Sequence, residues 1–382
     1  MIIIAYLFVL ANNWFFALRR KSNQVWVILT LAFIFLIFSG AGPFYSFHAD
    51  YHNYYRNYYN VIERGLLDNN QIGYSLIMII ANFLGLSFTT FRLLVIAVCI
   101  GILYKFVIKR YDVNVNYVLG LYMMYAIIID SEQFRNWIAF TVLLAGLPYL
   151  ESSVLRNKIK FCVFWFISIT FHYSFVFYFP LLLVSGKDKN KILTRLAWVS
   201  IILTGVIILN GNEIPIQDIF LNYADNRVIE AYLTTQTNLG YLIPMILHFS
   251  SIVLSYWSRK IVMKKYEFLP ASMSPSNERY TEYLMKKDEL KLVNIVYWTN
   301  IAMLVVLPMY IINVQFYRLM RGLLLATYIV CSKASSKLIR RTHLLVFNSM
   351  VVGSVFVWLF LDLIYRIDPG RLLLPFFLEN IL

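Results

Sequence analysis

The sequence predicts an all-α integral membrane protein, a polytopic bundle of about 11 to 12 transmembrane or re-entrant segments. Of its 382 residues 60% are apolar and 14% are charged, whereas a soluble globular domain carries about 25% charged residues. The mean hydropathy is +0.66. Apolar runs of about 17 to 25 residues, enough to cross about 30 Å of hydrocarbon, recur along the whole chain. We therefore expect one transmembrane domain over residues 1–382.

The first apolar run, residues 2–18, is expected to be an uncleaved spanning helix with its N-terminus outside. No basic residue precedes it, and Arg19, Arg20 and Lys21 follow it directly. A secretory signal would instead carry its positive charge in front. Further spanning or re-entrant runs are expected near residues 25–42, 74–86, 90–108, 114–130, 134–150, 160–184, 193–210, 239–257, 292–312, 317–331 and 343–363.

Three polar loops interrupt these runs. Residues 43–73 are tyrosine-rich and are expected to include an interfacial helix. Residues 211–238 hold four acidic residues against one arginine, and residues 258–291 hold eight basic and five acidic residues. Because cytoplasmic loops are enriched in Lys and Arg, we expect the first two loops to face outward and the third to face the cytoplasm.

The basic clusters conflict with a simple alternation of spans. Clusters lie at 19–21, 105–110, 156–160, 187–195, 258–291 and 333–341. They cannot all face the cytoplasm if every run crosses fully. One interpretation is that residues 74–86 enter the membrane and return to the same side, and that residues 160–184 bend at 171–174 instead of crossing. Non-helical backbone at membrane depth occurs only where it is buried in protein or lines a water-filled cavity. The alternative is that short loops obey the charge rule weakly.

The segment 50–60 combines tyrosines with amides and one carboxylate. Tyr51 and Tyr54 begin a series of tyrosines at helical spacing, whereas Asp50 and three asparagines form a second face. An interfacial helix with its rings at headgroup level would explain the tyrosines. Aromatic and polar faces side by side also suit sugars, and Asp50 is the residue least expected on structural grounds.

Three arginines are candidates for binding an anion. Arg135 stands between two apolar runs, where it could pair with Glu132 or a lipid headgroup, or grip a phosphate beside a helix N-terminus. Arg318 and Arg321 are one helical turn apart. Two arginines so spaced favour an anion site, and headgroup anchoring is the alternative.

His172 lies near the middle of the run 160–184. Ionisable groups within a membrane are functional hypotheses by default. An imidazole titrates near neutral pH, so His172 could act as a general base or orient a hydroxyl. A histidine that only bonds a carbonyl at a kink is the alternative.

Several common motifs are missing from the sequence. We find no Walker or GxGxxG loop, no cytoplasmic carboxylate pair of the DxD kind, no HExxH and no GxSxG. These absences disfavour nucleotide-driven pumps, nucleotide-sugar transferases with a soluble catalytic domain, and zinc proteases. The three cysteines lack metal-ligand spacing, so we expect no metal site. The net charge of +14 fits cytoplasmic loops, and we expect no nucleic-acid partner.

The motifs together resemble the EpsG/Wzy type of exopolysaccharide (O-antigen and capsule) repeat-unit polymerases. The matching segments are Asp50-Tyr51 with Tyr54, Gly73-Tyr74, Phe134-Arg135-Asn136, Phe171-His172-Tyr173-Ser174, and Arg318 with Arg321. This chain has Gln71 before the glycine, where the family often has an acidic residue. It has Asn136 where the family often has glutamine.

The resemblance implies a multi-pass glycosyltransferase of the bacterial cytoplasmic (inner) membrane, with an architecture like that of the GT-C class as one option. Its substrates would be undecaprenyl-diphosphate-linked oligosaccharides, joined on the outer face without a cofactor. The resemblance also implies that the protein lies in the lipid bilayer and works with a flippase and a chain-length regulator. Catalysis would fall to His172, Asp50 and Arg135, with substrate binding by Tyr51, Tyr54, Gln71, Asn136, Arg318 and Arg321.

Two other functions remain open on the sequence. A lipid-linked oligosaccharide flippase or other transporter could use the same basic and aromatic cavity without chemistry, although no internal repeat typical of transporters is evident. A membrane-bound acyltransferase that modifies surface glycans would also have an intramembrane histidine. It would not need arginines at both 135 and 318–321.

Overall fold

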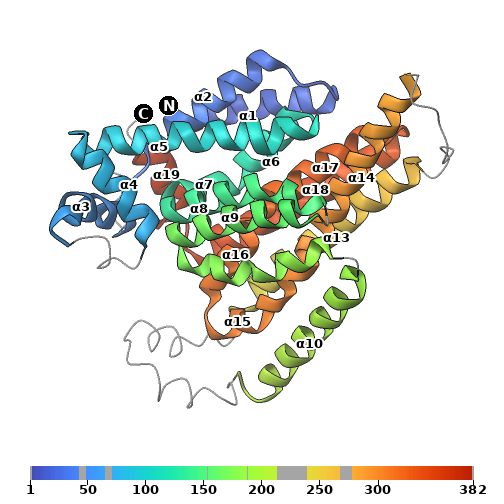
Figure 1. Cartoon of the computed structure of the whole chain (residues 1–382). Helices are drawn as coiled ribbons and strands as arrows, with labels where there is room; N and C mark the ends of the chain where they lie inside the picture. Colours follow the sequence, from blue (N-terminus) through green and yellow to red (C-terminus); the bar gives the residue numbers. More distant parts are fainter. Residues whose placement is uncertain are drawn as a thin grey trace.

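The computed structural model describes residues 2–42, 49–64, 71–152, 154–186, 188–212, 239–266 and 278–380. These residues form helices and loops and contain no β-strand (Figure 1). Four helical segments are long and apolar enough to cross a membrane, namely Phe88–Tyr111, Lys189–Leu209, Asp288–Ile312 and Arg341–Arg366. The predicted fold class, an all-α membrane bundle, is confirmed.

The helices follow one another with few long connections. The α-helices are α1 (Ile2–Leu18), α2 (Gln24–Gly40), α3 (Ala49–Arg64), α4 (Ile72–Phe83), α5 (Phe88–Ile102), α6 (Val115–Met124), α7 (Ala126–Glu132), α8 (Phe134–Gly146), α9 (Leu155–Phe171), α10 (Lys189–Leu209), α13 (Leu242–Tyr266), α14 (Glu278–Ala302), α15 (Leu307–Ile312), α16 (Tyr317–Arg321), α17 (Leu324–Lys337), α18 (Arg341–Trp358) and α19 (Leu373–Leu378). The 3-10 segments are η2 (Lys109–Tyr111), η3 (Leu147–Glu151), η4 (Tyr173–Ser185), η5 (Met303–Val306) and η6 (Val314–Phe316), and the π-helical ones are η1 (Leu103–Ile108) and η7 (Leu359–Arg366).

Polar residues just before three of these helices explain where they start. The side chains of Asn23, Ser87 and Asn114 accept hydrogen bonds from backbone N–H groups in the first turns of α2, α5 and α6. Such caps satisfy donors that have no partner within the helix. Beyond the caps the sequences are apolar, so these helices are held by packing and by the lipid rather than by charge pairs.

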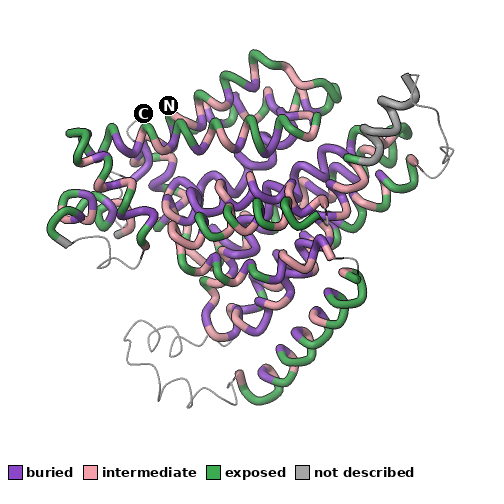
Figure 2. The backbone as a smooth tube through the Cα atoms, viewed as in Figure 1, coloured by how far each residue is buried: buried purple, intermediate pink, exposed green. Residues whose placement is uncertain are grey.

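The centre of the molecule is a series of short helices rather than one long span. The chain expected to run unbroken over 114–130 is interrupted at Tyr125, so that α6, α7 and α8 succeed one another. All ten residues of α6 are buried, and Figure 2 shows the buried residues concentrated in these helices and α17, whereas α10 is largely exposed. Interrupted helices inside protein are a place where polar groups can collect at membrane depth.

The run 160–184 bends where the sequence predicts it to bend. Helix α9 ends at Phe171, His172 has an extended backbone with φ −154° and ψ 114°, and the 3-10 segment η4 continues to Ser185. Helix α9 lies along α8 and contacts α4. The backbone of His172 is therefore a corner between two helical segments within the bundle.

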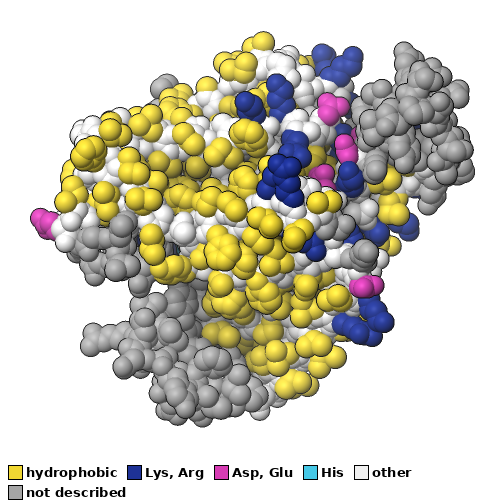
Figure 3. Space-filling model, in the orientation of Figure 1, with side chains coloured by type: hydrophobic (Ala, Val, Ile, Leu, Met, Phe, Trp, Pro, Cys, Tyr) yellow, Lys and Arg dark blue, Asp and Glu magenta, His cyan; other side chains and the backbone are white. Residues whose placement is uncertain are grey.

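Charged residues are distributed unevenly over the surface. In Figure 3 the visible Lys and Arg side chains gather on the right-hand side, and hydrophobic side chains dominate the rest of that face. Helices α3 and α4 lie at the opposite, left-hand end (Figure 1). The predicted outward loop 211–238 lies outside the described residues beyond 212, as do residues 43–48 and 65–70 of the loop 43–73 and residues 267–277 of the loop 258–291.

Candidate functional site

Arg135 lies in the first turn of α8, between two tyrosine rings from other helices. Its guanidinium carbon is 5.0 Å from the ring centre of Tyr54 on α3 and 5.9 Å from that of Tyr74 on α4. The two rings meet nearly edge to face, with centroids 5.9 Å apart. Both tyrosines are buried, with 6% and 2% of their surfaces exposed. The aromatic faces hold the arginine head in place through cation–π contact.

His172 and Arg318 lie within electrostatic range of this cluster. Arg318 and Arg135 are both close enough to His172 and to Tyr54 to interact with them electrostatically. Asp50 is close enough to interact with Tyr54 in the same way. The structure thus brings together five residues that the sequence singles out in four separate segments. His172 Nδ1 is 2.8 Å from the hydroxyl of Ser174, two residues further along the bend.

Several buried polar atoms around Arg135 have no hydrogen-bond partner within the described part of the chain. Asn136 is 2% exposed, and neither its Oδ1 nor its Nδ2 is paired. Hydrogen-bond partners in the described part of the chain are also missing for four other buried groups, namely Arg135 Nε, Arg318 Nε, Gln71 Oε1 and the Tyr74 hydroxyl. A buried polar group left unpaired costs about 1–3 kcal/mol. This collection of unsatisfied groups, which we call the open cluster, is what a bound polar ligand would complete.

The N-terminus of α8 adds to the positive character of the open cluster. The first backbone N–H groups of a helix lack partners within it, and the helix dipole places partial positive charge there. Arg135 and Asn136 are the second and third residues of this 13-residue helix. Donors, dipole and two guanidinium groups all favour an anion at this point.

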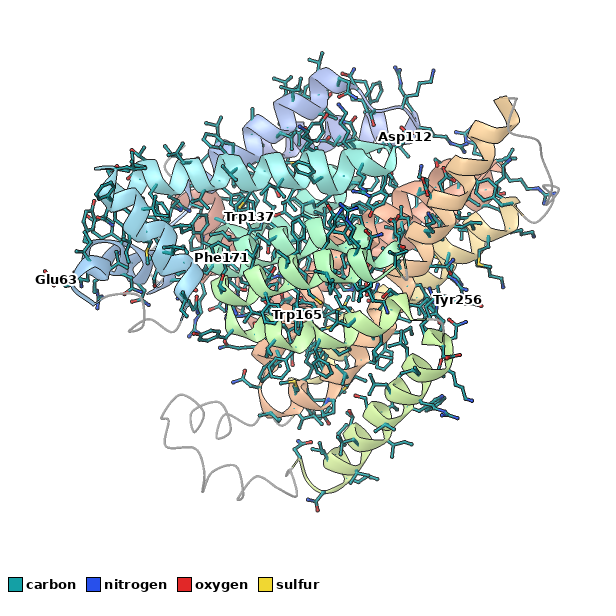
Figure 4. All side chains as sticks on the ribbon, viewed as in Figure 1. Glu63, Asp112, Trp137, Trp165, Phe171 and Tyr256 are labelled. Carbon is teal, nitrogen blue, oxygen red and sulfur yellow. The ribbon has the colours of Figure 1, made fainter. Side chains whose placement is uncertain are left out.

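A glycine brings α4 against the end of α9. A Cβ atom on Gly73 would lie 2.2 Å from Thr170 Oγ1, so only glycine permits this approach. The contact holds Gln71, which precedes α4, and Tyr74 close to the bend at His172. Figure 4 labels Phe171 at the end of α9 and Trp137 on α8; both lie between Glu63 at one end of the molecule and Asp112 at the other.

Arg321 has different surroundings from the other predicted arginines. Its guanidinium donates to Gln133 Oε1 at 2.6 Å and to the Tyr317 hydroxyl at 3.0 Å, and its Nε lies 3.5 Å from Asp130 Oδ1. Asp130 also accepts a hydrogen bond from the Tyr122 hydroxyl at 2.9 Å. Arg321 therefore links α16 to the junction of α7 and α8, and its guanidinium contacts residues outside the open cluster.

A second ion pair lies next to this one. Asp362 accepts hydrogen bonds from the Tyr125 hydroxyl at 2.5 Å and from Arg366 Nε at 2.6 Å, and the Arg366 guanidinium stacks 4.4 Å from the Tyr317 ring. Tyr317 links the two pairs. We call this connected set, built on the Asp130–Arg321 and Asp362–Arg366 pairs, the paired cluster.

Tyr51 lies one turn before Tyr54, in a separate hollow that also contains Arg92. Arg92 is 5% exposed, donates from Nη1 to the Ser39 carbonyl at 3.0 Å, and has its guanidinium 5.2 Å from the Tyr51 ring. The sequence reasoning did not select Arg92 or Asp130. Both are charged residues inside apolar runs, which is a signal for function in a membrane protein, and that signal could have identified them.

The arrangement can bind an anion and position a proton acceptor beside it. Across the described residues no group of three His, Cys, Asp or Glu side chains comes together to hold a metal ion. The groups present are guanidinium and amide donors, aromatic rings, one imidazole and one carboxylate. Such a set can stabilise negative charge that develops on a leaving group while a base takes a proton.

Comparison with known proteins identifies one family. The family model described as the EpsG family matches residues 25–378, nearly the whole chain. Neither the curated proteins nor the solved structures include one that matches this chain.

Proposed function

The chain belongs to the EpsG family, and we propose that it is a glycosyltransferase that polymerises undecaprenyl-diphosphate-linked oligosaccharide repeat units into a surface polysaccharide. Membership in the family together with the apolar helices indicates an integral membrane protein of polysaccharide synthesis. The finer proposal is that the reaction takes place on the outer face of the bacterial cytoplasmic membrane. A flippase would supply the lipid-linked units, and a chain-length regulator would act beside the polymerase.

The proposed reaction transfers the growing glycan from one lipid diphosphate to an incoming unit. A hydroxyl oxygen of the incoming unit forms a bond to the anomeric carbon of the growing glycan. The bond from that carbon to the diphosphate oxygen breaks, and undecaprenyl diphosphate leaves with the bonding electrons. The proton of the hydroxyl passes to a base on the protein. The atoms balance without an added oxidant, reductant or nucleotide.

The open cluster is the observation that carries this proposal. Arg135 Nε, Arg318 Nε and Asn136 Nδ2 are buried donors without partners in the described structure, and Arg135 and Asn136 lie in the first turn of α8. Diphosphate oxygens accept several hydrogen bonds at once and match the planar guanidinium. As the glycosidic bond breaks, negative charge grows on the diphosphate, so donors fixed in advance would lower the barrier.

His172 is the proposed base. Its Nδ1 lies 2.8 Å from the Ser174 hydroxyl, and in the proposed tautomer Nδ1–H donates to that hydroxyl, which leaves Nε2 to receive the proton of the incoming hydroxyl. Only a neutral imidazole can accept a proton. Asp50, on the same helix as Tyr54, is proposed to bind the glycan or to orient the base.

The test is polymerisation by the purified full chain in nanodiscs that contain its lipid-linked repeat unit. The wild type should convert single units into a ladder of longer products. His172→Gln keeps hydrogen bonding but removes proton transfer, so its rate should fall roughly 10²- to 10⁴-fold. Normal ladders from His172→Gln together with an inactive but folded Asp50→Asn would reverse the two roles.

A deletion strain separates the proposed polymerase from its two rivals. Loss of a polymerase should remove long glycan and leave single lipid-linked units on the outer face. Loss of a flippase should trap those units on the inner face, and loss of an acyltransferase should leave chain length unchanged. Either of the last two outcomes would refute the polymerase.

A further inference from the structure

Three rings follow one face of the 3-10 segment η4, starting at the bend. A 3-10 helix has three residues per turn, so side chains at i and i+3 lie directly above one another. His172 immediately precedes η4, and Phe175 and Tyr178 continue from it at this spacing. The ring centroids of His172 and Phe175 are 6.1 Å apart, and those of Phe175 and Tyr178 are 5.0 Å apart. The rings therefore form a continuous row that begins at the imidazole.

The row is fixed by its surroundings. Phe175 and Tyr178 are 1% and 0% exposed. The indole N–H of Trp165 on α9 donates to the Phe175 carbonyl at 2.7 Å, and Figure 4 labels this tryptophan. This bond fastens η4 to the helix that ends just before His172. The position of Tyr178 is therefore tied to that of His172.

The far end of the row meets α16, the short helix that carries Arg318. The Tyr178 hydroxyl donates a hydrogen bond to the carbonyl of Leu319, the residue next to Arg318. In a continued α-helix the Leu323 N–H would donate to that carbonyl. It donates instead to the Met320 carbonyl, at 3.0 Å. Tyr178 thus bonds a carbonyl at the end of a helix, where backbone acceptors lack partners within the helix.

Gly322 permits this contact between η4 and α16. A Cβ atom on Gly322 would lie 2.9 Å from the Tyr178 hydroxyl oxygen and 3.3 Å from Phe140 Cβ on α8. A side chain at this position would therefore push the tyrosine away from α16. Arg321 joins the same helix to Gln133 at the start of α8. Arg318 accordingly belongs to a helix that is held by two separate contacts.

We infer that Tyr178 is a positioning residue, which holds the Arg318 guanidinium and the His172 imidazole in one fixed arrangement. The inference rests on the proposed function, in which His172 takes a proton while Arg318 stabilises the charge on the departing diphosphate. Both events belong to one transition state, so both groups must meet the substrate together. A misplacement of about 1 Å can cost about 100-fold in rate. Because Tyr178 is fully buried, it acts through these two residues and not on the substrate.

Polymerisation by the full chain in nanodiscs is the first test. Tyr178→Phe keeps the ring and removes the bond to Leu319, so it should slow ladder formation roughly 10- to 100-fold. The matched control is Tyr6→Phe, because Tyr6 is another buried tyrosine whose hydroxyl donates to a carbonyl, that of Met123. The two variants should lose similar thermal stability, and Tyr6→Phe should form normal ladders. Equal rates for the two variants would overturn the inference.

A double variant separates positioning from a general loss of structure. Once Arg318→Gln has removed the guanidinium, Tyr178 has no guanidinium left to position. Adding Tyr178→Phe should then slow ladder formation by less than about twofold, because coupled residues are not additive. A tyrosine with a merely structural role would cost the same factor in both backgrounds. The full 10- to 100-fold loss in the Arg318→Gln background would therefore contradict positioning.

The nitrogen NMR spectrum of the histidine rings gives a signature that does not depend on activity. The chain has five histidines, and the His172 signals are those that disappear in His172→Gln. Arg318→Gln should shift them because it removes a charge within electrostatic range. Tyr178→Phe should shift them in the same direction because Arg318 is no longer held, and Tyr6→Phe should leave them in place. Unshifted His172 signals in Tyr178→Phe would count against the inference.

The positioning role and the proposed function fail in distinguishable ways. If the wild type makes no polymer but the His172 signals shift in both Arg318→Gln and Tyr178→Phe, the positioning role stands and the polymerase does not. If polymer forms while Tyr178→Phe changes neither the ladders nor the His172 signals, the polymerase stands and the positioning role does not.

Discussion

Arg318 and Arg321 lie one turn apart on α16, yet they belong to opposite kinds of cluster. Arg321 is 3% exposed and has Gln133, Tyr317 and Asp130 around its guanidinium. The Nε atoms of both arginines lack a hydrogen-bond partner among the described residues, but only Arg321 has a carboxylate nearby, whereas Arg318 lies within the electrostatic range of His172. The same residue type is therefore paired with a carboxylate at one position and lies near an imidazole at the other.

The contrast extends to the clusters that contain these arginines. In the paired cluster each guanidinium faces a carboxylate, so charges within the protein offset each other. In the open cluster Arg135, Arg318, Asn136 and Gln71 present donors and acceptors that the described residues leave unused. Buried polar groups are normally hydrogen-bonded. Unsatisfied ones gathered at a helix N-terminus therefore indicate where an external partner belongs.

The largest effect is expected where the paired cluster is broken. Asp130→Ala leaves the buried Arg321 without its carboxylate, which should destabilise the protein by about 3–5 kcal/mol. The measurement is the fraction of protein that remains monodisperse after heating in detergent. The control is Asp288→Ala, because the exposed pair of Asp288 with Lys291 contributes less than about 1 kcal/mol. Equal thermal profiles for the two variants would contradict the structural role of Asp130.

The next largest effect is expected on activity in the open cluster. Arg135→Lys should lose nearly as much polymerisation as Arg135→Ala, roughly 10²- to 10³-fold, because a point charge cannot replace a planar two-pronged donor. The thermal profile should stay close to that of wild type. Ladder formation in nanodiscs measures the first result. The exposed Arg156 provides the control, and Arg156→Lys should polymerise normally. An active Arg135→Lys variant would instead support the alternative role of Arg135, contact with a lipid headgroup.

A third prediction applies the same change to the two neighbouring arginines. Arg318→Gln should retain its thermal stability and lose activity at least tenfold. Arg321→Gln should lose stability first, because it leaves Asp130 as a buried carboxylate without its cation. Heat-induced aggregation and ladder formation are measured on both variants. The contrast between the clusters fails if both variants lose stability equally while their residual activities match.

The smallest effect is expected from Asn136. Replacing it with leucine removes two buried, unpaired polar atoms, which should raise stability by about 1 kcal/mol and lower activity. Thr299→Val is the matched control, since Thr299 on α14 is 1% exposed with an unpartnered hydroxyl. Thr299→Val should gain stability with unchanged ladders. Full activity in Asn136→Leu would remove Asn136 from the proposed substrate contacts.

The helices could be predicted because apolar runs are a strong local signal, whereas the bend near His172 is one of two interpretations of the basic clusters along the chain. Apolar runs of membrane-spanning length place the helices to within a few residues, as with α1 and α2. The break at Tyr125 could not be predicted, because an apolar sequence such as 114–130 is compatible with one continuous helix. Only tertiary packing decides where such a helix is interrupted.

Several of the residues that the sequence singles out lie near one another, but the partners of each could not be predicted. Asp50, Tyr54, Arg135, His172 and Arg318 converge in the structure, as the resemblance to the family suggests. The placement of Arg321 among Asp130 and Gln133 depends on contacts more than 180 residues apart in sequence. No spacing rule connects positions so far apart, so the sequence could not show that neighbouring arginines face different environments.

The position of the last helix brings the two termini of the chain close together. Helix α19 packs against the beginning of α1, where the rings of Phe376 and Phe377 lie 6.0 and 5.0 Å from that of Tyr6. The two ends of the chain therefore lie at the same end of the bundle (Figure 1). We expect both termini to lie on one side of the bilayer, which requires an even number of crossings. Reporter enzymes fused to either terminus should accordingly be active in the same compartment.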